Sequence, residues 1–241
     1  MLSIVTFRWA PTPGYRSRFG PETVNTLFAM LRRHSKIQFR PICVTDDPTG
    51  IDKSIEIAPL WPDYADVPSP HGSSRPSCYR RLKVFSAEAE AMFGPRFAVM
   101  DLDCVVTGDV TPLLERPEAF VMWGDTHPKT HYNGSLMLMN AGARRQVWES
   151  FNPKTSPLRT KRAGHYGSDQ GWISYCLGPG EARFTMKDGV YSYRLHLSQA
   201  SALPANCKLV FWNGKLDPWS PEVKDVPWVK QHYRREVPAA V

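Results

Sequence analysis

The sequence predicts an α/β fold: a single domain with a mostly parallel central sheet flanked by helices. Apolar runs of strand length alternate with segments of helical periodicity, the pattern of such folds. A chain of 241 residues with 42% hydrophobic content can bury one sizeable core. Acidic residues directly follow one apolar run, and open sheets of this kind bind ligands at the carboxyl ends of their strands.

The N-terminal part predicts the order strand, helix, strand, strand. Residues 2–7 form an apolar run typical of a buried strand. Pro21 opens a helix, because proline is favoured in the first turn and the apolar residues after it recur at helical spacing. Residues 39–45 and 54–58 are predicted as the next strands, separated by a turn rich in Pro, Gly and Asp.

A proline-rich segment interrupts this alternation. Residues 60–77 have the composition of a mobile loop, which we interpret as a flap over a binding site. A second helix is predicted from Tyr79 to the helix-stopping pair that begins at Gly94. Residues 97–100 then form a strand that runs directly into Asp101. This strand delivers an Asp-Leu-Asp triplet at its carboxyl end.

The second half of the chain predicts further strands and helices. Their ranges are 119–123, 135–140 and 208–212 for the strands, and 143–151 and 168–177 for the helices. Ser168 is the expected N-cap of the last helix. Residues 224–241 are polar and are expected to form a peripheral tail, so the domain is predicted to span residues 1–223.

The composition argues against a membrane span, a disulfide framework and a zinc site. No apolar run approaches the roughly 20 residues of a membrane span. The N-terminus has the pattern of a first strand and not of a signal peptide, so we expect a cytoplasmic protein. The 5 cysteines lie far apart and form no Cys-x-x-Cys pair, which argues against a disulfide framework and against a zinc site.

The charge of the chain favours a partner that carries phosphates. The net charge is +7 and the isoelectric point is near 9.2. A nucleotide, a nucleic acid and an anionic surface all fit this balance. The basic residues are scattered, with pairs at Arg32-Arg33, Arg80-Arg81, Arg144-Arg145, Lys161-Arg162 and Arg234-Arg235. Solvated helix faces carry such pairs routinely, so a pair alone does not mark a site.

Asp101 and Asp103 form a candidate metal site. In an extended segment, residues i and i+2 project to one side, so both carboxylates can face one cation while Leu102 points into the core. Carboxylate oxygens suit Mg²⁺ or Mn²⁺, which bridge carboxylates to phosphate oxygens. The alternative is a chance match, because roughly two acidic-x-acidic triplets are expected in such a composition. The apolar residues on both sides favour the metal site, since a buried carboxylate pair needs a cation.

Five blocks of sequence carry a resemblance to a known family. In chain order they are Tyr79-Arg-Arg-Leu-Lys83, Ala98-Val-Met-Asp-Leu-Asp103, Asn133-Gly-Ser-Leu-Met-Leu-Met-Asn140, Gly167-Ser-Asp-Gln-Gly-Trp172 and Phe211-Trp-Asn-Gly-Lys-Leu-Asp-Pro-Trp219. In these blocks the chain resembles the GT-A glycosyltransferases, and particularly the retaining glycogenin-like and lipopolysaccharide galactosyltransferase-like enzymes of the family 8 type. The resemblance implies a Rossmann-like GT-A domain, a nucleotide diphosphate sugar as donor and Mn²⁺ or Mg²⁺ as cofactor.

The resemblance assigns donor-binding roles to several blocks. It implies that Asp101 and Asp103 bind the metal and the diphosphate, with Leu102 between them among the donor-binding positions. Arg81 becomes a donor-binding cation, assisted by Lys83; the alternative for Arg81 is an ordinary exposed helix cation.

Two further blocks are expected to meet the sugar. Asn133 and the backbone at Gly134 are expected to meet the donor sugar's hydroxyls, although a turn before a strand would also explain them. Asp169 and Gln170 resemble the family's Asp-Gln pair beside the anomeric carbon and the acceptor. Capping of a helix N-terminus is a compatible role for Asp169.

The last block contains one departure from the family. Gly214 is expected to let the backbone approach the diphosphate, and Lys215 to supply a positive charge to it. Similar transferases commonly carry a histidine as third metal ligand at the position that Asn213 occupies here. An amide oxygen is a weaker ligand, so the departure puts tight metal binding in doubt.

The nucleotide base is expected across the ends of the first two strands, near Thr6, Phe7 and Asp46, on fold analogy. The family favours a uridine nucleotide and retention of anomeric configuration. Among the histidines, His165 lies near the Asp-Gln block and is a candidate base.

The acceptor is left open by the sequence. A glycan fits the family, and a hydroxylated base in DNA fits the positive charge, with a groove lined by clusters such as Lys161-Arg162 and Arg32-Arg33. A noncatalytic nucleotide or nucleic-acid binding module on the same fold is the main alternative to an enzyme. A nucleotidyltransferase would carry a glycine-rich loop after the first strand, and residues 8–14 contain only one glycine.

Overall fold

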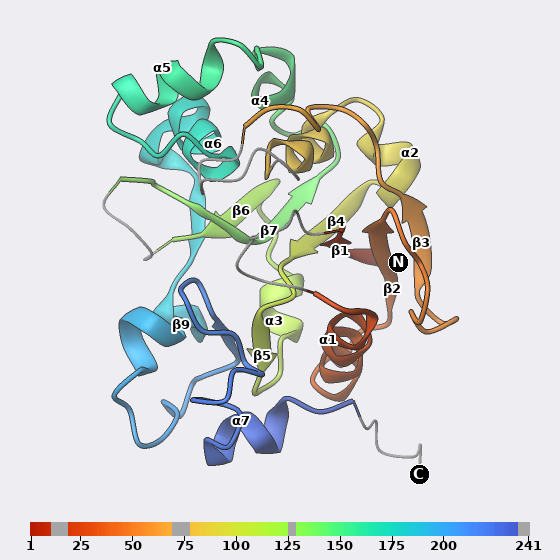
Figure 1. The fold of residues 1–241 in the computed structure, drawn as a ribbon, viewed down its shortest axis with the longest axis vertical. Helices are drawn as coiled ribbons and strands as arrows, with labels where there is room; N and C mark the ends of the chain where they lie inside the picture. Colours follow the sequence, from red (N-terminus) through yellow and green to blue (C-terminus); the bar gives the residue numbers. More distant parts are fainter. Residues whose placement is uncertain (11–18, 69–77, 125–128, 236–241) are drawn as a thin grey trace.

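The structure is a computed structural model that describes residues 1–10, 19–68, 78–124 and 129–235. A central sheet separates two layers (Figure 1). Helices α2, α4, α5 and α6 lie on one side of it, and α1, α3, α7 and a small second sheet lie on the other. This arrangement confirms the predicted α/β fold with helices on both faces of a mostly parallel sheet.

The central sheet has 7 strands in the order β3-β2-β1-β4-β7-β6-β8. Within the described residues, β7 is the one strand that runs against the others. The strand bounds are β1 Leu2–Arg8, β2 Phe39–Thr45, β3 Glu56–Pro59, β4 Arg96–Met100, β6 Phe120–Trp123, β7 Asn133–Asn140 and β8 Ala182–Phe184. The predicted strands near residues 2–7, 39–45, 54–58, 97–100, 119–123 and 135–140 are all present.

The second sheet joins distant parts of the chain. It has 3 strands in the order β5-β10-β9. Their bounds are β5 Cys104–Val106, β9 Val190–Ser192 and β10 Leu209–Phe211. β5 begins directly after the Asp-Leu-Asp triplet and pairs antiparallel with β10, so the end of β10 lies beside Asp103.

The helices fill the two outer layers. Their bounds are α1 Pro21–Arg33, α2 Ala89–Phe93, α3 Thr111–Leu114, α4 Gln146–Glu149, α5 Ser156–Arg162, α6 Asp169–Leu177 and α7 Pro227–His232. Shorter turns are the 3₁₀ helices η1 Cys78–Phe85, η2 Gly178–Gly180 and η3 Met186–Asp188, and the π-helical turn η4 Tyr193–Leu197. None of the helices in the described ranges is long and apolar enough to cross a bilayer.

Each central strand contributes side chains to both layers. In β4, Phe97 and Val99 belong to the core under α2 and α4, whereas Ala98 and Met100 belong to the core that includes α1 and the second sheet. Successive side chains of a strand point to opposite faces, so a strand covered on both sides is apolar throughout. This explains why the run before Asp101 is continuously apolar.

The prediction of one helix from Tyr79 to Gly94 was wrong. The chain forms η1 and α2, interrupted at residues 86–88. The amide of Ser86 donates to the carbonyl of Lys83, and the Ser86 hydroxyl accepts from the amide of Glu88 at 3.3 Å. A serine that satisfies nearby backbone groups in this way competes with a continuous helix.

The predicted helix over 143–151 is also shorter than expected. Only Gln146–Glu149 is helical, and turns surround it. The helix predicted over 168–177 is confirmed, with Ser168 as N-cap accepting from the amide of Gly171 at 3.2 Å. Of the proposed flap over 60–77, residues 69–77 lie outside the described residues.

The segment expected to be a polar tail contains α7. Trp228 and Val229 of this helix are buried in the core that includes α1. The guanidinium of Arg33 donates to the carbonyls of His232 at 2.6 Å and Arg234 at 2.7 Å. Residues 227–234 are therefore packed against the domain by both apolar and polar contacts.

Candidate active site

Asp101 lies where two strands of opposite direction meet. β4 ends at Met100 and its neighbour β7 begins at Asn133, so the carboxyl end of one strand adjoins the amino end of the other. The amide of Asp101 donates to the carbonyl of Ser135 at 3.0 Å and holds this junction. The reversal of β7 brings its first residues to the sheet edge where ligands of open sheets bind.

Arg81 connects three parts of this edge. Its Nη1 donates to Oδ1 of Asp101 at 2.9 Å, its Nη2 donates to the carbonyl of Gly134, and its Nε lies 3.5 Å from Oδ2 of Asp169. The side chains of Arg81, Asp101 and Asp169 are 14%, 29% and 10% exposed. A planar guanidinium suits this role because its donors form a rigid fork. The predicted residues of three separate blocks therefore form one cluster.

The charges of this cluster depend on one another. Burial works against the charged guanidinium, but the carboxylates of Asp101 and Asp169 outweigh it and raise the pKa of Arg81. Burial raises the pKa of Asp101, and the positive charge of Arg81 and a hydrogen bond from Ser135 partly oppose this effect. One cation thus lies between two carboxylates in a mostly desolvated place, where removing it would leave like charges facing each other.

The lack of a side chain at Gly134 lets the guanidinium of Arg81 lie against β7. A Cβ at this position would lie 2.7 Å from Nη2 of Arg81, so any other residue would displace the side chain. The amide of Gly134 donates to Oε1 of Gln170 at 3.3 Å. Both backbone polar groups of Gly134, which were expected to meet the sugar, therefore have protein partners in this structure.

A close backbone crossing positions Asp169 and Gln170. A Cβ on Gly171 would lie 1.9 Å from the carbonyl oxygen of Tyr166, so residues 165–167 cross directly over the first turn of α6. The hydroxyl of the buried Tyr79 donates to the carbonyl of Gly167 and ties this crossing to η1. The helix N-terminus also favours the negative charge of Asp169, as expected.

Three other predicted donor-binding residues, Asn133, Leu102 and Lys83, have different surroundings. Asn133 is buried, and its Oδ1 accepts from the amide of Ser135 at 2.8 Å. The side chain of Leu102 packs in the core, as its position in the triplet predicted. Lys83 is paired elsewhere, since its Nζ lies 2.8 Å from Asp63 and 3.1 Å from Glu88.

The predicted base site contains one hidden and two accessible residues. Thr6 is fully buried, and among the described residues its Oγ1 has no hydrogen-bond partner. Phe7 is half-buried and packs edge-on against Trp61 at 5.6 Å between ring centroids. Asp46 is exposed and accepts from the amide of Ala10 at 3.2 Å. Of these three predicted residues, Phe7 and Asp46 therefore present accessible side chains.

The last sequence block reaches the carboxylates through the second sheet. The amide of Trp212 donates to the carbonyl of Asp103 at 2.8 Å, so Asn213 follows immediately beyond this contact. The side-chain oxygen of Asn213 accepts from the hydroxyl of Ser192. Lys215 is exposed.

Arg194 lies over the same loop. Its Nε donates to the carbonyl of Asn213 at 2.9 Å, and its Cδ would lie 3.0 Å from a Cβ on Gly214. The sequence did not single out Arg194 or Ser192. Both are at the end of β9, a strand of three residues that carries no recognisable pattern by itself.

The donor set fits a divalent cation only in part. Asp101 and Asp103 supply oxygen ligands, as Mg²⁺ and Mn²⁺ prefer. However, Asp101 shares one oxygen with Arg81, and the oxygen of Asn213 accepts from Ser192. Across residues 1–10, 19–68, 78–124 and 129–235, no group of three His, Cys, Asp or Glu side chains could hold a metal. These residues fit a cation that phosphate oxygens help to hold, and not a preformed protein cage.

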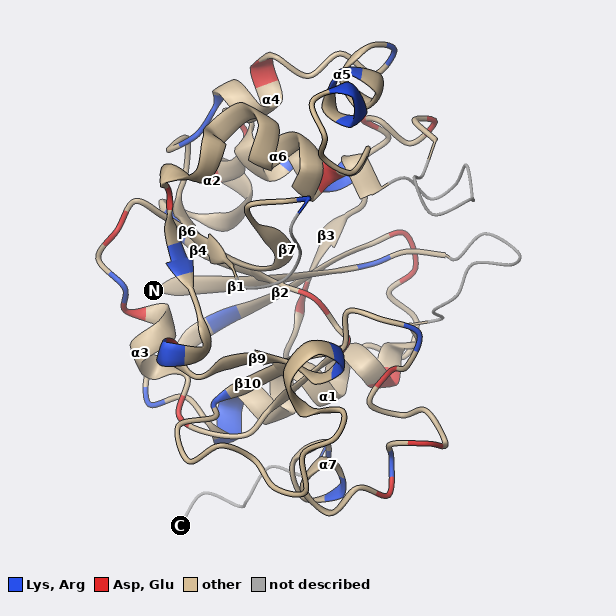
Figure 2. Ribbon diagram, turned by 90° about the vertical axis from the view of Figure 1, so that its left-hand side faces the viewer, with Lys and Arg blue, Asp and Glu red and all other residues tan. Residues whose placement is uncertain are grey.

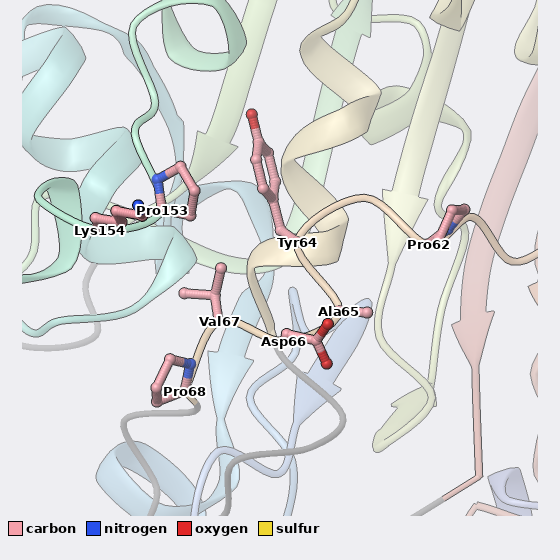
Figure 3. Close-up of a pocket in the computed structure, with 8 residues that line it drawn as sticks. All are labelled: Pro62, Tyr64, Ala65, Asp66, Val67, Pro68, Pro153 and Lys154. Atoms are coloured by element: carbon pink, nitrogen blue, oxygen red, sulfur yellow. The ribbon is translucent and has the colours of Figure 1, made fainter.

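Two other features border the α5–α6 side. A cleft of about 460 Å³ lies between residues 62–68 and the pair Pro153 and Lys154 (Figure 3), and none of the predicted site residues lines it.

The second feature is a pair of histidines. The rings of His131 and His165 lie 5.1 Å apart, and Nδ1 of His165 is 3.1 Å from the carbonyl of Lys129. Burial, the neighbouring His165 and a nearby arginine lower the pKa of His131.

The two basic pairs proposed to line a DNA groove do not share one surface. Lys161 and Arg162 are exposed on α5, and Figure 2 shows this helix on the opposite side of the central sheet from α1. Arg33, at the end of α1, holds α7 through the carbonyls described above. The Cδ of Lys161 would lie 3.0 Å from a Cβ on Gly167, so of these two pairs only that on α5 approaches the Asp169 turn.

Comparison with known proteins identifies the fold. No family model matches the sequence, and no curated protein matches it. The galactosyltransferase LgtC, solved with donor and acceptor sugar analogs, is similar in structure, with a TM-score of 0.63 and 12% identity over 95% of this chain and 93% of LgtC.

Two further solved structures share this fold. The glycosyltransferase GlyE of Streptococcus pneumoniae TIGR4 gives a TM-score of 0.55 at 12% identity over 92% of this chain and 57% of GlyE. Mouse xyloside xylosyltransferase 1 gives 0.53 at 11% identity over 88% of this chain and 97% of that one. The chain has the fold of these glycosyltransferases, which confirms the GT-A fold expected from the sequence blocks.

Proposed function

We propose that this protein is a glycosyltransferase that moves a sugar from a nucleoside diphosphate, of the uridine type, to an acceptor hydroxyl. The observation that carries the proposal is the Arg81 cluster. It joins Asp101, Gly134 and Asp169 at the ligand-binding edge of a fold that known glycosyltransferases share. Clefts at this edge are the usual location of binding sites in open α/β sheets.

Asp101 and Asp103 form the diphosphate end of the proposed site, where they would hold Mn²⁺ or Mg²⁺ against the phosphates. Such an ion acts there as a Lewis acid that stabilises charge on the departing phosphate. Arg81 holds Asp101 in place by donating to its Oδ1, and the positive charge of Arg81 partly opposes the rise that burial causes in the pKa of Asp101.

Asp169 and Gln170 form the sugar end. Their carboxylate and amide can hold sugar hydroxyls by directional hydrogen bonds. A structurally similar form of LgtC is described as an active-site mutant in which glutamine is replaced by glutamate, which supports a role for Gln170. We further propose retention of the anomeric configuration, in line with the family that the sequence resembles.

The proposed acceptor is a glycan hydroxyl or the hydroxyl of a modified base in DNA. The basic residues of α5 lie on the Asp169 side, which favours an acceptor that carries phosphates. A DNA acceptor predicts that transfer falls steeply as salt increases, whereas transfer to a neutral glycan should respond little to salt.

Release of nucleoside diphosphate tests the function. The protein is incubated with a panel of nucleotide sugars and Mn²⁺ or Mg²⁺, with and without hydroxymethylated DNA. We expect release with one donor, lowered about 100-fold or more by Asp103→Ala. Glu222→Ala, at an exposed position away from the cluster, is the control and should retain full activity. Donor binding without release in any condition would indicate a noncatalytic binding module instead.

A further inference from the structure

In the loop that approaches Asp103, the side-chain oxygen of Asn213 already accepts a hydrogen bond. Asn213 occupies the position expected to complete a metal site, but its Oδ1 accepts from Ser192. The same Ser192 hydroxyl accepts from the amide of Leu195 at 3.2 Å and so caps η4. The bond from Ser192 therefore fixes the orientation of Asn213 Oδ1 and occupies one of its two lone pairs. Among the described residues of this loop, Asn213 is therefore not held ready as a metal ligand.

Two cations stand at the same loop. Arg194 is the second residue after β9, and its Nε is anchored to the carbonyl of Asn213. This anchor leaves both terminal nitrogens of the guanidinium available, and the side chain is exposed. Lys215 is also exposed, two residues further along the loop. Within the described part of the chain, neither cation forms an ion pair with a carboxylate.

The second sheet fixes the distance between this loop and the carboxylates. β9 and β10 run parallel, with Ser192 opposite Phe211, so their ends lie at one edge. The rings of Tyr193 and Trp212 stack with centroids 4.8 Å apart and planes 9° from parallel. The amide of Trp212 is bonded to Asp103. Arg194 is thus connected to Asp103 through the stacked Tyr193 and Trp212, which places it on the side of the site where Asp103 would meet a diphosphate.

We infer that Arg194 binds the diphosphate of the donor directly, beside the Lys215 that the sequence already indicated, and supplies positive charge that a complete metal site would otherwise supply. This inference rests on the proposed function. When the bond from the anomeric carbon to the phosphate oxygen breaks, the nucleoside diphosphate leaves with the electron pair. The oxygen of the acceptor hydroxyl forms the new bond to the anomeric carbon, and its proton passes to the departing phosphate. A guanidinium is suited to the leaving phosphate because it donates two parallel hydrogen bonds to phosphate oxygens.

Equilibrium binding of the nucleoside diphosphate tests this inference without turnover. Calorimetry with UDP, or with the diphosphate of whichever donor the panel identifies, is performed in EDTA and again with Mn²⁺. We expect the unmodified protein to bind in EDTA, and Arg194→Ala to weaken that binding about 10-fold or more, because charge-assisted hydrogen bonds are lost. The loss should be smaller with Mn²⁺, and smaller again for UMP, which has no second phosphate.

Matched variants separate binding from folding. Arg194→Lys keeps the charge and should recover part of the affinity, whereas Lys187→Ala, at another exposed cation, should leave it unchanged. Thermal unfolding of Arg194→Ala should match that of Lys187→Ala, since both side chains are exposed.

The outcomes distinguish the inference from the function on which it rests. Diphosphate binding in EDTA that Arg194→Ala leaves intact would overturn the inference and leave the transferase proposal standing. Equal losses for UDP and UMP would also overturn it, because the second phosphate would then play no part. Failure of the unmodified protein to bind any nucleoside diphosphate, with or without metal, would overturn both.

Discussion

The two walls of the candidate site are built in different ways. One wall, here called the sheet wall, consists of Arg81, Asp101, Gly134, Asp169 and Gln170, and nearly every polar group in it already has a protein partner. The other, here called the loop wall, consists of Ser192, Arg194, Asn213, Gly214 and Lys215, and it presents exposed cations to solvent.

The two walls therefore differ in whether their charged side chains have partners before a ligand binds. The sheet wall holds its carboxylates in fixed positions before any ligand arrives, at the energetic cost of burying charge. The loop wall keeps its cations hydrated and gains electrostatic partners only when an anion binds. Substitutions in the sheet wall should therefore affect stability and activity together, whereas those in the loop wall should affect ligand binding alone.

Arg81→Ala should give the largest effect. It leaves Asp101 and Asp169 without their shared cation, so we expect the free energy of unfolding to fall by about 3 kcal/mol. Donor cleavage should fall about 100-fold in the same variant. Arg81→Lys keeps the charge but not the fork, and should recover stability more than activity.

Urea unfolding and the rate of nucleoside diphosphate release measure the two effects of Arg81 separately. Arg145→Ala, at an exposed arginine before α4, is the control for losing a cation. Unchanged stability in Arg81→Ala would contradict the description of the sheet wall as preorganised.

Gly171→Ala should rank second. The added Cβ would meet the carbonyl of Tyr166 at 1.9 Å, and backbone cannot move aside as a side chain can. Overpacking of this kind costs about 1–3 kcal/mol. Displacement of residues 165–167 should also shift Asp169 and lower the maximal rate. Gly180→Ala meets nothing within 4 Å and serves as the matched control in urea unfolding; equal effects of the two variants would rule out the crossing.

A pair of glycine substitutions compares the two walls directly. In Gly134→Ala the new Cβ would lie 2.7 Å from the anchored Nη2 of Arg81, whereas in Gly214→Ala it would lie 3.0 Å from the Cδ of the exposed Arg194. We expect a loss of about 1 kcal/mol for the first and less than about 0.5 kcal/mol for the second. Thermal unfolding of both variants provides the measurement, and a reversed order would contradict the comparison.

The sequence predicted the sheet wall much better than the loop wall. Asp101 follows an apolar strand, and Asp169 follows a serine cap, so local signals placed both residues correctly at element ends. The partners of Gly134 and Lys83 were not predictable, because they come from residues distant in sequence. Arg194 was not identified because the strand before it, β9, has only 3 residues and its position is fixed by pairing with β10.

The helix α5 shows a second reason why sequence analysis can miss an element. Its inward face consists of Ser156 and Thr160, and the hydroxyl of Thr160 donates to the carbonyl of Ser156 at 2.7 Å. A helix that packs through hydroxyls has no apolar periodicity, which is the main signal that sequence analysis uses. The serine cap of α6 and the proline at the start of α1 gave clearer signals.

Low pH should give the smallest effect of the set. It should destabilise the region around the loop wall before the sheet wall. Trp212 packs at a tilt against Trp228 of α7, and the rings of His34 and His232 lie 5.6 Å apart where α7 meets α1. Burial lowers the pKa of both histidines. The neighbouring Arg33 and Arg234 add to this effect, and Asp109 opposes it at His34.

The sign of the acid effect follows from these lowered pKa values. Below about pH 6.5 the unfolded chain binds more protons at these two positions than the folded protein does, so stability falls as the pH decreases. Urea unfolding at several values between pH 5 and pH 8 should show this slope, and His34→Gln with His232→Gln should flatten it. A slope that survives both substitutions would place the acid sensitivity elsewhere.

The pairing of β5 with β10 also sets the order in which the protein can be completed. Just outside these two strands, the hydroxyl of Thr107 donates a hydrogen bond to the carbonyl of Cys207, 100 residues away in the sequence. During synthesis, β5 emerges early and its pairing edge stays open until β10 follows. Long-range pairing of this kind forms slowly, and an open strand edge invites association with other chains. The loop wall is thus the last part of the site to form, and a ribosome that stalls before residue 209 would leave a chain prone to aggregate.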